Sequence, residues 1–327
     1  MAEASRTRVI LVFCVCSSAA AVYVWAKRRK IFRKHPKITK RMADNRVQRS
    51  QKKKIAQRTS NDAELRFRPI GHIQSCFPNR RGTPRQGFFT PSTRATLLLR
   101  RGLAPHALEG IHAYSHLWIT FVFHANTQAQ KRKQNAKGRV RLKIQPPKYD
   151  RRVGVLSTRS PHRPNPIGQT VVRLESVDLQ NGLLHLSGID FVDGTPVLDV
   201  KPYVPLYDSI PTATIPDWVC NAGNTSAVEV RWSPLARDQV NSTILSLMQF
   251  YSTKKEVVQV INEVLQQNMR SGGARSRRQR RGHNISEPSA QRFCFSFDGV
   301  DVKCVEHAQD SSGKRHITVE SILASKA

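Results

Sequence analysis

Apolar and polar residues alternate through the middle of the chain in short runs that are typical of β-strands. Such runs occupy residues 67–73, 90–101, 115–124, 153–158, 170–179 and 183–189. The run at 115–124, SHLWITFVFH, is almost continuously apolar and predicts a central buried strand. Asn181-Gly182 separates the last two runs and predicts a hairpin with a type I′ turn, whose two centre residues both have positive φ. Because short neighbouring strands usually pair, the pattern predicts a mainly β fold, a small antiparallel β-barrel.

After residue 208 the pattern becomes that of a smaller α+β region. Residues 209–218 are proline-rich and indicate a domain boundary. Thr253 and Glu256 have the spacing of a capping box and predict a helix start, as does Ser233 followed by Pro234. The apolar residues of the second helix fall on one face, which indicates packing rather than a cofactor site: Val257, Ile261, Val264 and Leu265. Asp298-Gly299 predicts a tight hairpin turn near the end of this region.

Two polar loops follow predicted strands and are candidates for a functional site. The first, STRSPHRPNPIG at residues 157–168, contains three prolines that fix the backbone before any ligand binds. It presents side chains suited to an anion and a planar heterocycle: Arg159, His162, Arg163 and Asn165. The second, DGTPVLDVKPY at residues 193–203, begins with a turn and continues with Asp199, Lys201 and Tyr203 on one face. A surface turn with incidental charge is the alternative for either loop alone, but the pair indicates a site.

Basic residues greatly outnumber acidic ones, with 54 Lys and Arg against 23 Asp and Glu and a formal net charge of +31. This excess points to nucleic acid or an anionic membrane surface as the partner. The charge lies in blocks, since residues 27–58 hold fifteen basic residues with only Asp44 as an acid, and residues 131–152 hold ten against Asp150. Six arginines lie between Arg270 and Arg281. Solvated arms that contact nothing are the alternative interpretation of these blocks.

Residues 9–26, VILVFCVCSSAAAVYVWA, form eighteen consecutive positions without a charge, just long enough to span a bilayer. The Lys and Arg residues after this run would hold its C-terminal side in the cytosol, so we expect a membrane anchor with a cytoplasmic catalytic region. A mitochondrial or amphipathic targeting segment is the rival interpretation.

The six cysteines have no metal-binding spacing, and we expect neither a metal site nor a disulfide framework: Cys14, Cys16, Cys76, Cys220, Cys294 and Cys304.

Together with Gly82-Thr83-Pro84-Arg85-Gln86 and Phe121-Val122-Phe123-His124, the two polar loops resemble the TrmO family, also called TsaA-like or YaeB-like. The resemblance covers residues 68–208 and continues more weakly over 218–305. It implies a single-sheet β-barrel that binds S-adenosylmethionine, a homodimer, and N6-methylation of threonylcarbamoyladenosine beside the anticodon of tRNA. Where the family has an Asp-Pro-Arg motif, this chain has Asn268-Met269-Arg270, so only the arginine is kept.

The resemblance also implies roles for individual residues. Those that would contact the cofactor are Pro84, Arg85, Gln86, His124, Ala125, Arg159, Gln169, Asp193, Gly194, Thr195 and Pro196. Gln169 replaces an apolar residue, so its contact would come from the backbone. Candidates for RNA contact are Arg163, Lys201, Arg270, Arg277, Arg278, Arg280 and Arg281. A base that removes the N6 proton would assist methyl transfer, and Asp199 and His162 are the candidates. A catalytically silent RNA-binding protein and a membrane-tethered adaptor are the alternative functions.

These observations divide the chain into six parts. We expect an apolar segment at 1–26, a basic disordered linker at 27–64, the catalytic barrel at 65–210, a linker at 211–232, a small α+β domain with an arginine-rich insert at 233–307, and a tail at 308–327.

Overall fold

The computed structural model describes residues 65–103, 105–125, 142–146, 149–223, 228–267, 290–307 and 315–325. The chain divides into a unit of residues 1–66 and a unit of residues 67–327, and every described helix and strand belongs to the second. The expected apolar segment at 9–26 and linker at 27–64 lie outside the described residues. Among the helices of the described segments, none has the length and apolarity needed to cross a membrane.

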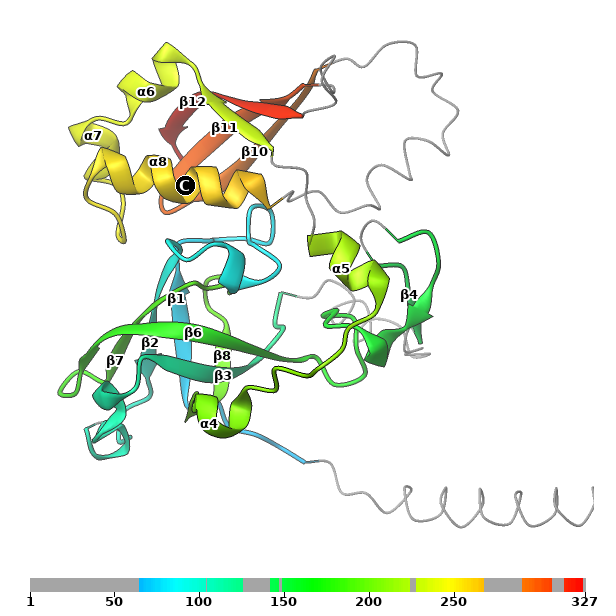
Figure 1. Ribbon diagram of the computed structural model, residues 1–327. Coiled ribbons are helices and arrows are strands. Elements are labelled where there is room, and N and C mark those ends of the chain that lie inside the picture. Colours follow the sequence, from blue (N-terminus) through cyan, green and yellow to red (C-terminus); the bar gives the residue numbers. More distant parts are fainter. Residues whose placement is uncertain are drawn as a thin grey trace, which may run out of the picture. The chain divides into compact units, whose positions relative to one another are not determined.

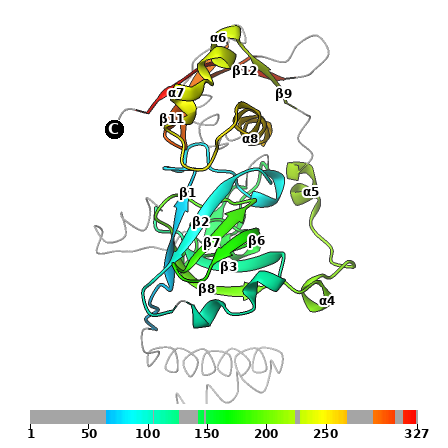
Figure 2. The ribbon, with the colours of Figure 1, turned by 90° about the vertical axis from the view of Figure 1, so that its left-hand side faces the viewer.

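Six strands close into an antiparallel barrel (Figures 1 and 2). In their order around the barrel they are β1 (Gly71–Ser75), β2 (Arg94–Leu99), β7 (Leu183–Ser187), β6 (Ile167–Asp178), β3 (His116–Val122) and β8 (Pro196–Pro202), and β8 pairs with β1 again. Alternate residues of β3 point inward, where Leu117, Ile119 and Phe121 are buried. The predicted small antiparallel barrel is confirmed, although β3 buries one face rather than both.

The hairpin between β6 and β7 is confirmed, but its predicted type I′ turn is wrong. Asp178 pairs with Leu183, so the turn has four residues between the strands. Gly182 has a φ of 67°, whereas Asn181 does not have positive φ. The Asp178 carboxylate accepts bonds from the backbone N of Asn181 at 3.0 Å and from its Nδ2 at 2.6 Å. This side-chain cap holds the longer turn, which needs only one left-handed residue.

The predicted strand at 153–158 is also largely wrong. Only β5 (Val153–Gly154) is extended, and it pairs with β4 (Lys143–Ile144) in a separate small sheet. A 3₁₀ turn, η4 (Val155–Ser157), follows, and Thr158 closes it because both its backbone N and its Oγ1 donate to the Val155 carbonyl. Short 3₁₀ turns also flank β2 and β3: η1 (Gly87–Phe89), η2 (His106–Leu108) and η3 (Ile111–Ala113).

The C-terminal part forms a second, four-stranded sheet. Its order is β10 (Gln291–Phe297), β11 (Val300–Glu306), β12 (His316–Ala324) and β9 (Glu229–Trp232), with β9 parallel to β12. The helices of this part are α6 (Pro234–Gln239), α7 (Ser242–Leu245) and α8 (Lys254–Gln266), while α4 (Pro205–Asp208) and α5 (Asp217–Gly223) follow the barrel. Figure 1 shows α8 lying along this sheet.

The predicted helix starts of this part are confirmed. Ser233 accepts a bond from the backbone N of Ala236, and Thr253 and Glu256 form both bonds of the capping box. The apolar stripe of α8 is buried, as expected for packing: Val257, Val260, Ile261, Val264 and Leu265. Asp298-Gly299 is a two-residue turn with φ of 43° and 83°, which is the type I′ geometry expected there.

The barrel and the C-terminal sheet share one hydrophobic core. The ring of Phe77, just after β1, packs edge-on against Phe297 of β10 at 5.6 Å between centroids, and Tyr251 lies 5.3 Å from Phe297. The backbone N of Asp298 donates to the Cys76 carbonyl at 2.8 Å. Polar contacts join the same two parts, because Glu263 of α8 accepts bonds from the backbone N and Oγ of Ser92 at 2.8 and 2.6 Å.

Candidate functional site

Arg159 and Gln86, 73 positions apart in the sequence, meet through a direct hydrogen bond. Arg159 Nη1 donates to Gln86 Oε1 at 2.7 Å. Gln86 belongs to the segment 82–86 before η1. Arg159 belongs to the first polar loop, STRSPHRPNPIG, whose residues 157–166 precede β6 and are called the proline-rich loop below. The contact therefore brings together two of the motifs that sequence analysis selected, and it leaves most of the guanidinium fork available to an anion.

His124 and the segment 193–196 form a second pair of converging motifs. Thr195 Oγ1 lies 3.4 Å from His124 Nδ1, and a Cβ added to Gly194 would lie 3.9 Å from Nε2 of the same imidazole. Hydrogen bonds hold both the side chain and the backbone of Asp193. Its Oδ1 accepts from the backbone N of Ser75 at 2.9 Å, and its own backbone N donates to Phe77 O at 2.8 Å. Partial burial lowers the pKa of His124, while the neighbouring Asp193 opposes the shift. At neutral pH the imidazole is therefore neutral.

Backbone contacts join these two pairs at one end of the barrel. The N of Phe123 donates to Pro166 O at 2.8 Å, which ties the end of β3 to the proline-rich loop. Gly87 packs so closely on Gly188 that an added Cβ would lie 1.9 Å from the Gly188 carbonyl oxygen, which ties segment 82–87 to the start of segment 188–195. Gly87 therefore cannot carry a side chain without moving the loop. The four motifs therefore lie near one another at a single rim of the barrel.

The proline-rich loop is internally ordered by its own side chains. The N of Ser160 donates to Thr158 Oγ1 at 3.3 Å, and the N of His162 donates to Ser160 Oγ at 3.2 Å. Arg163 Nη1 donates to Thr158 O at 3.0 Å, so this arginine braces the loop. Its expected contact with RNA would have to come from the remaining guanidinium donors.

Asp190 lies beside this rim and was missed in the sequence analysis. Its Oδ1 has essentially no contact with solvent and no hydrogen-bond partner in the described part of the chain. Burial raises the pKa of Asp190 to about 7, and a bond from Thr170 and the charge of Arg159 oppose the shift. The available signal was its position between Ile189 and Phe191, which are both apolar and buried. Their packing shields the Oδ1 atom of Asp190 from water, although the residue as a whole is partly exposed.

Asp199 and Gln169 do not lie on the loops. Both are in register with Thr120, so they form a row across β6, β3 and β8. Asp199 forms an ion pair with Lys201 in which both side chains are about half exposed or more. The structure thus places these three predicted residues on the strands, whereas the converging residues come from the rim.

The remaining predicted residues differ in how well the structure describes them. Pro84 is buried, and partial burial of the guanidinium lowers the pKa of Arg85 although the residue is exposed overall. Pro196 pairs with His72 where β8 closes on β1, and Ala125 is the last described residue after β3. The arginines expected to contact RNA at 270, 277, 278, 280 and 281, and the Asn268-Met269-Arg270 triplet, lie outside the described residues.

The C-terminal part supports the rim directly. Gly82 has a φ of 100°, and an added Cβ would lie 2.7 Å from the ring of Phe295 on β10.

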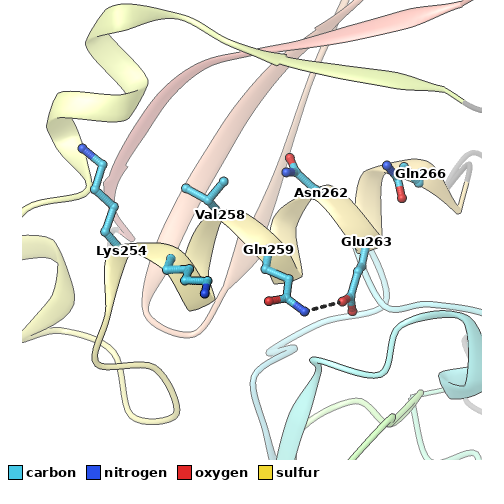
Figure 3. Close-up of a pocket in the computed structure, with 7 residues that line it drawn as sticks. Lys254, Val258, Gln259, Asn262, Glu263 and Gln266 are labelled. Carbon is cyan, nitrogen blue, oxygen red and sulfur yellow. Dashed lines mark hydrogen bonds between the residues drawn. The ribbon is translucent and has the colours of Figure 1, made fainter.

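A shallow groove of about 660 Å³ runs along α8 and is lined mainly by polar residues, none of them predicted for the site. Figure 3 shows Gln259 and Glu263 on the side of α8 that faces the barrel, where Gln259 Nε2 donates a hydrogen bond to Glu263 Oε1. No three His, Cys, Asp or Glu side chains of the described segments are grouped to hold a metal ion.

Comparisons with known proteins agree with this geometry. A family model described as the tRNA-methyltransferase O N-terminal domain matches residues 72–209. The mouse tRNA (adenine(37)-N6)-methyltransferase is 46% identical over 145 residues, which are 43% of this chain and 31% of that protein. A Pseudomonas aeruginosa relative, assigned as an S-adenosylmethionine-dependent methyltransferase RcsF, is 44% identical over 179 residues, 53% of this chain and 70% of the relative.

A solved structure supports the fold over a longer span. The crystal structure of TrmO from Pseudomonas aeruginosa has a TM-score of 0.57 and 31% sequence identity, and covers 80% of this chain and 100% of that one. The chain spans only about a third of the length of the mouse relative.

Proposed function

Because the chain belongs to the TrmO family, we propose that it transfers a methyl group from S-adenosylmethionine to N6 of an adenosine in tRNA. The observation that carries this proposal is the convergence of Arg159 with Gln86, and of His124 with segment 193–196, on one rim of a closed barrel. The names of the mouse and Pseudomonas relatives support the reaction class and the cofactor.

The residues of the rim suit such a cofactor. Arg159 offers guanidinium donors for a carboxylate, and Asp193 offers a fixed negative charge near a neutral imidazole. Gly194, with φ of 72°, allows the backbone of its turn to approach a ligand closely. When bound, S-adenosylmethionine supplies a methyl group activated by a positively charged sulfur. The rim residues bind and orient it, which is what an in-line displacement requires most.

The substrate that we propose is threonylcarbamoyladenosine next to the anticodon. Its N6 lone pair is delocalised into the ring and the carbamoyl group, so removal of the N6 proton would assist attack by about 10²- to 10⁴-fold. His162 lies in the ordered rim loop, whereas Asp199 would have to leave its ion pair with Lys201 before accepting a proton. Both stay our candidates for the base, and a homodimer stays our expectation for the assembly.

Calorimetry with S-adenosylmethionine tests the assignment of the rim. Arg159→Ala should weaken binding by about tenfold, because an exposed charge-assisted hydrogen bond is worth about 1.5 kcal/mol. Arg173→Ala is the matched control, since Arg173 is an exposed arginine on β6 that pairs with Glu175. Equal affinities for the two variants and the unaltered chain would remove Arg159 from the cofactor site. Lack of binding by the folded, unaltered chain would favour a catalytically silent RNA-binding protein.

A further inference from the structure

Two phenylalanine rings are held in solvent immediately after the cofactor-binding segment. Phe88 is 84% exposed and Phe89 is 46% exposed. Their rings are nearly perpendicular, at 80°, with centroids 5.5 Å apart. Each ring therefore keeps apolar surface in water, which is unfavourable unless a partner covers it.

The turn that carries both rings is rigid. Gly87 is packed backbone to backbone on Gly188, and the backbone N of Thr90 donates to Gly87 O at 2.9 Å. Thr90 and Thr93 are fully buried, and Thr93 Oγ1 links Thr90 O at 2.7 Å to segment 188–195 through the backbone N of Ile189 at 2.8 Å. The two rings are therefore held by a rigid, hydrogen-bonded turn and not by a loose loop.

The turn adjoins the proposed cofactor site on one side and the end of α8 on the other. Gln86, which accepts the Arg159 bond, directly precedes the turn. On the other side, Gln267 at the end of α8 donates from Nε2 to Phe89 O at 3.4 Å. Arg270, the first of the six arginines, follows Gln267 by three positions in the sequence.

We propose that Phe88 and Phe89 form a stacking platform for a nucleobase of the tRNA that flanks the methylated adenosine. The inference rests on the proposed function. Aromatic faces bind bases without regard to sequence, and two perpendicular rings offer one face for stacking and an edge that limits sliding. The strong positive charge of the chain favours a polyanion over an apolar protein partner.

A set of substitutions separates stacking from general hydrophobic contact. Phe88→Leu and Phe89→Leu keep apolar volume but remove the planar ring, whereas Phe88→Tyr keeps it. Stacking on an aromatic ring is worth about 1 to 3 kcal/mol per base, so each Leu variant should raise KM for tRNA by roughly 5- to 150-fold. Phe88→Tyr should stay near the unaltered value. Leu206→Ala removes another exposed apolar side chain, 89% exposed on α4, and should change nothing.

Fluorescence of the Phe88→Trp variant gives a readout that does not depend on activity. An anticodon stem-loop RNA should quench the new tryptophan, and the same RNA without bases in its loop should not. If the unaltered chain methylates tRNA but the Leu variants keep its KM, or if both RNAs quench equally, the platform is wrong. If no tRNA is methylated but quenching depends on the bases, the proposed reaction fails and the platform stands. Leu variants that change a dimer to a monomer in light scattering would show that the rings bind a second copy, which overturns the proposal.

Discussion

Truncation of Phe297 to alanine tests whether the barrel and the C-terminal sheet form one cooperative unit. Phe297 is fully buried on β10 and contacts Phe77 from the barrel side and Tyr251 from the segment before α8. Truncating a buried phenylalanine to alanine costs about 3 to 5 kcal/mol in comparable cores, because buried apolar contact is lost and a cavity is left. Each aromatic pair contributes a further 0.5 to 1.5 kcal/mol, roughly. Since domains are stable by only about 5 to 15 kcal/mol, the variant should keep less than half of its unfolding free energy at the lower end of that range.

Urea unfolding followed at two tryptophans measures this effect. Trp118 lies on β3 of the barrel and Trp232 lies on β9 of the C-terminal sheet, so variants that keep only one of the chain's four tryptophans, either Trp118 or Trp232, report on one part each. Phe297→Ala should lower both midpoints together. Phe77→Ala should do the same, and the double variant should lose about 1 kcal/mol less than the sum, because the two rings touch.

The matched control is Phe88→Ala, which removes the same side chain from an exposed position. It should change the free energy of unfolding by less than about 0.5 kcal/mol. Two separate transitions in the unaltered chain, or a Phe297→Ala shift confined to Trp232, would refute the shared core. In that case the second sheet could not support the Gly82 segment as Phe295 suggests.

Further predictions concern pH, salt and the loop backbone. Because burial raises the pKa of Asp190 to about 7, the folded state keeps its proton up to that pH, whereas the unfolded state releases it near the ordinary aspartate pKa of about 3.9. The free energy of unfolding should therefore fall as the pH rises between those two values, by about 4 kcal/mol at most. Asp190→Asn should flatten this fall in thermal melts across that range, and an unchanged slope would count against a buried carboxyl. Affinity for tRNA should fall steeply with salt, and neutralising the basic residues of 131–152 and 270–281 should reduce that slope; the same slope in the neutralised chain would leave those blocks as solvated surface. Gly87→Ala should cost several-fold in S-adenosylmethionine affinity by calorimetry, because its Cβ would meet the Gly188 carbonyl, whereas Gly154→Ala, which has room for a Cβ, should not.

Local sequence rules predicted much of the fold because the relevant interactions are short-range. Alternation gave the barrel strands, and the Thr253 and Glu256 spacing gave the start of α8. The same turn rule succeeded at Asp298-Gly299 and failed at Asn181-Gly182, where the Asp178 side chain holds a longer turn. Such a cap depends on geometry that a two-residue signal does not contain.

The candidate site was predictable only in part. Two of the motifs on the rim could be selected as polar loops, and the other two, 82–86 and 121–124, only by resemblance to a family. The Arg159 to Gln86 bond joins positions 73 residues apart and depends on strand order. Asp190 was missed because a single acid beside apolar residues resembles an ordinary turn, and its burial comes from the packing of Ile189 and Phe191. Asp199 was selected by alternation along a strand, which does not specify the side chain that pairs with it.

The most direct test of the proposed function is methyl transfer to tRNA that differs only in one modification. The chain would be incubated with S-adenosylmethionine and either tRNA bearing threonylcarbamoyladenosine or its unmodified transcript, and the digested nucleosides analysed by mass spectrometry. We predict that the threonylcarbamoyladenosine gains one methyl group on N6 and that the transcript gains almost none. A folded chain that binds S-adenosylmethionine and leaves the modified tRNA unmethylated would contradict the proposed substrate.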